Sequence, residues 1–179
     1  MASGRLHDRA TWLLALPAGL LVWPWLGWSG VAATGAGFLV GGLLLSPDLD
    51  THSRPTARWG LLRGLWWPYR RLLRHRSVIS HSPLLGTAVR LAYLGGMVVL
   101  LALLLHLLGV PGVPSLWAGG LELWRQHQSL LIATLVGVEA SSWLHLMQDG
   151  DPMPRLPRGL RRRRQRRRQR RSRRRQRRQ

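Results

Sequence analysis

The chain contains no cysteine and no lysine, and only 7 of its 179 residues are acidic. The absence of cysteine excludes disulfides, thiolate metal sites and cysteine nucleophiles, so a bound metal must be held by nitrogen and oxygen. The absence of cysteine does not indicate whether the protein lies in an oxidising or a reducing compartment. All 27 basic residues are arginines, and 14 of them lie between Arg161 and Arg178. The body through Leu160 therefore carries a net charge of only +6. The mean hydropathy of -0.05 averages a very apolar body with a very polar tail.

Charge is also missing from long stretches of the body. The 38 consecutive residues from Ala10 to Pro47 contain none, whereas about 20 apolar residues suffice for a helix to cross a bilayer. This run predicts two membrane spans, near 10–28 and 31–47, with the break between them at Trp28-Ser29-Gly30. The alternative is a cleaved signal peptide over roughly the first 33 residues. The length of the run, with its two prolines and four tryptophans, favours a membrane anchor instead.

Two further spans are predicted near 91–110 and 130–147. The first of these is uncharged, while the second contains Glu139 and His145. Ionisable residues inside a membrane are usually paired or functional. The sequence thus predicts an all-α, polytopic membrane protein with about four transmembrane helices in a domain over residues 1–157.

The distribution of arginine predicts how these spans are oriented. Arginines precede the first span, follow the fourth, and number eight between Arg54 and Arg90, in the loop between the second and third spans. Because positively charged loops stay on the cytoplasmic side, we expect both termini and this loop to be cytoplasmic. Four spans satisfy this arrangement and three do not.

The loop over residues 48–82 and the tail over residues 158–179 both predict contact with anionic lipid headgroups. In the loop, tryptophans and leucines interleave with arginines, which is typical of interfacial amphipathic helices, here divided at Pro68. Ser82-Pro83 predicts the start of the next helix. The tail cannot form a core and is expected to be disordered in isolation. It could bind lipid or RNA, of which lipid is favoured, and nothing indicates sequence-specific binding of nucleic acid or a particular protein partner.

Residues able to bind a metal fall near the cytoplasmic ends of the predicted spans. They are His7, Asp8, Asp48, Asp50, His75, His81, His145 and Asp149. His145 and Asp149 are four residues apart, so both would project from one helix face toward one ion. An extended segment after Pro47 would point Asp48 and Asp50 the same way. Imidazole and carboxylate without thiolate suit a divalent transition metal, zinc first and manganese, iron or nickel as alternatives.

Each of these clusters also has a purely structural interpretation. His7 and Asp8 could be a polar pair at a helix start, Asp48 and Asp50 could belong to a turn, and His75 could be solvated in its arginine-rich loop. The convergence of all four clusters on one membrane face favours a metal site. Eight candidates exceed the needs of one tetrahedral ion. The sequence therefore predicts either two ions, or one ion whose ligands are oriented by the remaining side chains.

Several motifs occur together in a fixed order. They are Ser3–Arg9, Ser46–Thr51, Arg58–Gly60 with Leu65–Tyr69, His75–Pro83 and His145–Asp149. In this order they resemble a bacterial and archaeal family of uncharacterised metal-binding membrane proteins. That family is similar in motif order to inner-membrane proteins described as membrane-bound metal-dependent hydrolases. The resemblance covers roughly Ser3 to Asp151 and implies the bacterial inner (cytoplasmic) membrane, metal binding by the eight residues above, and hydrolysis.

A metal with an open coordination position would activate water beside the lipid headgroups. We therefore expect hydrolysis of a phosphoester or related membrane-associated substrate, with Asp50 as general base and Arg76 holding an anionic oxygen. The alternative is a non-catalytic membrane protein with a structural or sensing metal site. A transporter is less well supported, because the candidate ligands lie at one face and not near the bilayer midplane.

Overall fold

The computed structural model describes residues 4–73, 77, 80–110 and 113–150. In these residues the chain is all-helical, as predicted. The six α-helices are α1 (Gly4–Leu20), α2 (Trp23–Leu43), α3 (Arg54–Arg58), α4 (Trp66–Leu72), α5 (Leu85–Leu107) and α6 (Val113–Gln148). Two 3-10 helices, η1 (Pro47–Asp50) and η2 (Gly60–Leu65), lie in the connection between α2 and α4. The predicted disordered tail, His75 and Arg76 lie outside the described residues.

The helical path is interrupted twice between α1 and the main part of α2. The chain turns at Leu21 and Val22, and it is non-helical again at Gly27, directly before the predicted break at Trp28–Gly30. Pro24 occupies the first turn of α2, where the missing N–H of proline is no loss. Gly27 has a φ of 57°, a left-handed conformation that glycine adopts without a steric penalty, and α2 is sharply kinked there.

Three helical segments have the length and apolar composition needed to cross a membrane. They are Trp23–Asp50, Leu85–Leu107 and Leu116–Gln148. The span expected near 10–28 is instead divided between α1, which has 17 residues and retains Arg5, Asp8 and Arg9, and the start of α2. Three segments rather than four therefore meet the length and hydropathy expected of a span among the described residues.

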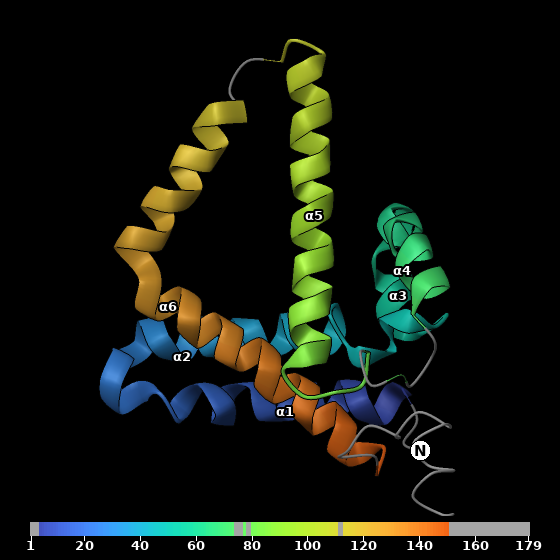
Figure 1. Ribbon diagram of the computed structural model, residues 1–179. Coiled ribbons are helices and arrows are strands. Elements are labelled where there is room, and N and C mark those ends of the chain that lie inside the picture. Colours follow the sequence, from blue (N-terminus) through green and yellow to red (C-terminus); the bar gives the residue numbers. More distant parts are fainter. Residues whose placement is uncertain (1–3, 74–76, 78–79, 111–112, 151–179) are drawn as a thin grey trace, which may run out of the picture.

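The core is formed by α1, α2 and the C-terminal half of α6, which lie side by side in Figure 1. Helix α6 bends at His127, so its N-terminal half rises away from this layer together with α5 (Figure 1). Most of α5 is little buried within the chain, and its leucines and valines are exposed. A surface of that kind needs an apolar covering, such as lipid.

Small residues allow α2 and α6 to approach closely. A Cβ atom on Gly37 would collide with the backbone carbonyl of Thr134, and one on Gly137 would collide with the carbonyl of Thr34. A Cβ on Gly41 would meet the backbone of Val138. The two backbones are therefore in direct contact, as in membrane helix pairs with small residues at their interface.

The connection from α2 to α5 packs around an aromatic cluster. Trp66 and Tyr69 are buried against Leu45 and Leu49, and the ring of Tyr93 lies 5.6 Å from that of Trp66. Burial raises the pKa of Tyr69 to about 12, so its phenol stays neutral at physiological pH. The cluster anchors η1, which carries Asp48 and Asp50, to the rest of the fold.

Two predicted helix boundaries in this region were wrong. Pro68 does not divide two helices, because it falls in the first turn of α4 and no intrahelical N–H is required there. Helix α5 begins at Leu85 rather than at Ser82-Pro83. Leu84 precedes it with a φ of 60°, and its N–H donates to the carboxylate of Glu139 at 2.8 Å. A contact with α6 therefore defines where α5 starts.

Candidate metal centre

Two helices bring three candidate ligands together. His7 projects from α1, while His145 lies in the last turn of α6 and Asp149 directly follows it. One ligand atom of each side chain lies within 4.8 Å of the others. His7 Nε2 is 3.3 Å from Asp149 Oδ1, and His145 Nε2 is 3.9 Å from Asp149 Oδ2. The three side chains are at most 9% exposed.

Each imidazole is held by a polar partner at Nδ1. His7 Nδ1 lies 2.6 Å from Gln148 Oε1, and its Nε2 faces the carboxylate of Asp149. His145 Nδ1 lies 3.3 Å from the hydroxyl of Ser46, and its Nε2 makes no hydrogen bond among the described residues. An imidazole nitrogen and a carboxylate oxygen face each other favourably when a proton or a metal ion lies between them.

That cation could be a proton on each ring, but the packing of the rings opposes it. The imidazoles of His7 and His145 are stacked with centroids 4.1 Å apart and planes inclined by 23°. Two stacked imidazolium ions would repel each other in a buried setting. The two imidazoles and the carboxylate of Asp149 together form the nitrogen and oxygen donor set of a divalent metal. The residues present therefore fit a metal ion.

A second group of predicted residues lies beside these three. Asp48 Oδ2 is 3.5 Å from His145 Nε2, and Asp48 Oδ1 is 3.9 Å from His81 Nε2. On the other side of the His81 ring, Nδ1 is 3.5 Å from Asp50 Oδ2 and 3.1 Å from Ser80 Oγ. The segment carrying both aspartates is a 3-10 turn and not extended as predicted, yet both carboxylates face His81. Asp48 connects the two groups.

The structure thus gathers six of the eight predicted ligands. Asp8 is directed elsewhere: its Oδ2 pairs with Arg54 at 2.8 Å and with Arg58 at 2.7 Å, which ties α1 to α3. His75, like the predicted anion-binding Arg76, lies outside the described residues. His52 is exposed.

Sequence reasoning missed Gln148 and Ser46, which orient the two histidines, and Arg90, a buried arginine of α5. Arg90 is 1% exposed. Its guanidinium donates to the carbonyl of Ser80 at 3.3 Å and to Thr87 and Ser142 at 3.0 Å each. It therefore holds the residue preceding His81 against α6. The sequence feature that could have identified Arg90 is a single arginine, one helical turn after Thr87, in an otherwise apolar helix.

Replacement of Arg90 by leucine is expected to lower the free energy of unfolding by about 2 kcal/mol. The carbonyl of Ser80 would lose its buried donor, at a cost of roughly 1–3 kcal/mol, while Thr87 and Ser142 would still bond to each other. Chemical unfolding in detergent, followed by circular dichroism, measures the change. Arg125, exposed on α6, provides the control as Arg125→Leu. Equal stability of the two variants would contradict the assigned role of Arg90.

Comparison with known proteins also indicates metal binding. An uncharacterized protein of Aquifex aeolicus (strain VF5) is 52% identical over 61 residues, an alignment that covers 34% of this chain and 43% of that protein. No solved structure matches the chain. A family model described as uncharacterized metal-binding protein (DUF2227) matches residues 2–155, nearly all of the body. The chain therefore belongs to this family of metal-binding proteins, and the His7, His145 and Asp149 group is its candidate metal site.

Proposed function

We propose that this protein is a membrane-embedded metal-binding protein whose site hydrolyses a phosphoester or related bond in a membrane-associated substrate. Three apolar helices support the membrane location, and the distribution of arginine supports a bacterial inner membrane with the arginine-rich loop and tail on the cytoplasmic side. The arginine-rich loop and tail would contact anionic headgroups. His7, His145 and Asp149 would hold the ion, with zinc first among the candidates and manganese, iron or nickel as alternatives.

The observation that carries the hydrolase proposal is the His81–Asp50 pair beside the three-ligand group. A divalent metal, when bound by three protein ligands, supplies Lewis-acid activation of water at its remaining position. With Nδ1 directed at Asp50 and Ser80, His81 presents Nε2 toward Asp48 and the ligand group. Nε2 can accept a proton from water there, and Asp50 stabilises the resulting imidazolium.

This geometry changes the role expected of Asp50. The sequence predicts Asp50 as the general base, whereas its position behind the His81 ring suits an orienting partner. Its side chain is fully buried, with 0% exposure, and its Oδ2 lies 3.5 Å from the Nδ1 of His81. Asp48, with a side chain that is 27% exposed, lies on the open side of the site.

The test is hydrolysis by the full chain, purified in detergent and loaded in turn with zinc or manganese. We expect cleavage of bis(p-nitrophenyl) phosphate, and we expect His81→Gln to lower kcat/KM by about 100-fold or more while the metal is retained. His106→Gln, an exposed histidine near the end of α5, is the matched control and should leave both unchanged. Full activity of His81→Gln would contradict its role as the base.

A structural metal is the second candidate, and the burial of the ligands favours it. The three side chains join α1 to the end of α6, and an ion there would link the two ends of the core. Under this alternative the metal-loaded protein hydrolyses no phosphoester, and removal of the metal lowers the midpoint of thermal unfolding. Metal retention without any hydrolysis would therefore decide against the hydrolase and for a structural site.

A further inference from the structure

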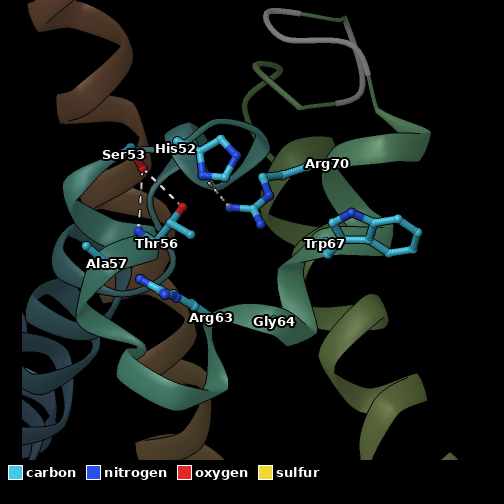
Figure 2. A pocket seen from close by; sticks show the side chains of 8 residues that line it. All are labelled: His52, Ser53, Thr56, Ala57, Arg63, Gly64, Trp67 and Arg70. Atoms are coloured by element: carbon cyan, nitrogen blue, oxygen red, sulfur yellow. Dashed lines mark hydrogen bonds between the residues drawn. The ribbon is translucent and has the colours of Figure 1, made fainter.

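A separate pocket, which shares no residue with the metal centre, opens between α3 with the turn that precedes it, η2 and α4. Figure 2 shows the side chains that surround it. The cavity has a volume of about 730 Å³, within the range of small-molecule sites. Its polar and aromatic lining residues are His52, Ser53, Thr56, Arg63, Trp67 and Arg70, and no acidic residue lines it.

The charge at this pocket is uncompensated within the described residues. Arg70 reaches from α4 to His52, with Nη1 3.5 Å from the ring Nδ1 (Figure 2), and Arg63 enters from η2. Neither arginine has a carboxylate within 4.0 Å among the residues that the structure describes. Two other arginines of the same connection differ in this respect. Arg54 and Arg58 both form ion pairs with Asp8.

The walls of the pocket are ordered by hydrogen bonds to the backbone. Ser53 Oγ donates to the carbonyl of Asp48 at 2.8 Å, and Thr56 Oγ1 donates to the carbonyl of Thr51 at 2.8 Å. These hydroxyl protons are therefore engaged, and the charged donors left for a ligand are the two guanidinium groups, beside the imidazole of His52. Two arginines and a histidine around one cavity match an anion with several acceptor oxygens.

We propose that this pocket binds a phosphate group carried by a small anionic molecule. Guanidinium groups pair with phosphate oxygens through two parallel hydrogen bonds, and the indole of Trp67 offers an apolar wall beside the anion. The phosphate could belong to a lipid headgroup or to a soluble ester. Leu61, Leu62 and Leu72, in η2 and α4, are exposed, so acyl chains would find an apolar surface nearby. The proposal does not depend on the metal or on hydrolysis.

The test follows Trp67 itself, because the arginine-rich tail would bind anions in any measurement of the whole chain. The full chain is labelled with 5-fluorotryptophan in neutral detergent, and the Trp67 signal is assigned among the 10 tryptophans with Trp67→Phe. Glycerol 3-phosphate and dihexanoyl phosphatidic acid are added separately. We expect a saturable shift of the Trp67 ¹⁹F signal, and at least a tenfold higher Kd for Arg63→Gln/Arg70→Gln, because two charge-assisted pairs are lost.

Arg5→Gln/Arg9→Gln is the matched control, since it removes two exposed arginines outside the pocket. It should bind like the unmodified chain, and unchanged signals of the other tryptophans show that each variant is folded. Saturation by both ligands supports a phosphate site that needs no acyl chain. Saturation by the phosphatidic acid alone supports a lipid headgroup. No saturable shift in the unmodified chain, or equal affinity in Arg63→Gln/Arg70→Gln, overturns the proposal.

Discussion

Replacement of His145 by alanine is expected to lower the bound transition metal from about one equivalent per chain to less than about a tenth. His145 supplies a nitrogen that faces both Asp48 and Asp149, and its loss leaves one imidazole and one carboxylate of the three-ligand group. Two ligands do not hold a divalent ion against buffer and chelator. Elemental analysis of the purified protein, after dialysis against a weak chelator, measures the change.

A second variant separates loss of the ligand from loss of the fold. Asp149→Asn keeps the size of the side chain but removes the charged oxygens that face His7 and His145. It should also lose the metal while its circular dichroism spectrum remains that of the unmodified chain. His106→Ala, on the exposed surface of α5, controls for the removal of any histidine. Retention of one equivalent by both His145→Ala and Asp149→Asn would rule out this centre.

The sequence was sufficient to predict that His7, near the start of the body, lies close to His145 and Asp149, near its end. Charge-free runs place His7 and His145 at helix ends, and the four-residue spacing puts Asp149 beside His145. These are local patterns that topology then aligns. The ion pairs of Asp8 could not be predicted in this way, because its partners Arg54 and Arg58 lie on a separate helix. Which acid meets which base depends on tertiary packing.

Helix boundaries were less predictable for a related reason. The break at Leu21 and Val22 lies inside an uncharged run, where hydropathy does not distinguish one apolar residue from the next. The start of α5 depends on Glu139, which belongs to α6 and accepts a hydrogen bond from the N–H of Leu84. Similarly, Arg90 is read from the sequence as one of many loop arginines, although its partners Ser80 and Ser142 bury it. Long-range contacts override the local signals in each case.

The glycines at the interface of α2 and α6 allow the close helix packing that positions the metal ligands. Gly37→Leu is expected to lower the free energy of unfolding by about 3 kcal/mol, because a side chain there collides with the Thr134 backbone and overpacks the interface. Chemical unfolding in detergent measures the loss. Gly95→Leu on α5 is the control, since nothing lies within 4 Å of its added Cβ and leucine favours the helix more than glycine does.

The same substitution also tests whether helix packing positions the ligands. The C-terminal half of α6 carries His145, is directly followed by Asp149, and packs along α2, while α1, with His7, packs on α2 as well. An α6 displaced from α2 would separate His145 from His7, so Gly37→Leu should weaken metal binding by tenfold or more even under conditions where it remains folded. Gly95→Leu should bind metal normally. Unchanged affinity in folded Gly37→Leu would mean that the ligands are held together without this interface, through the contacts of Ser46 and Gln148 with the two histidines.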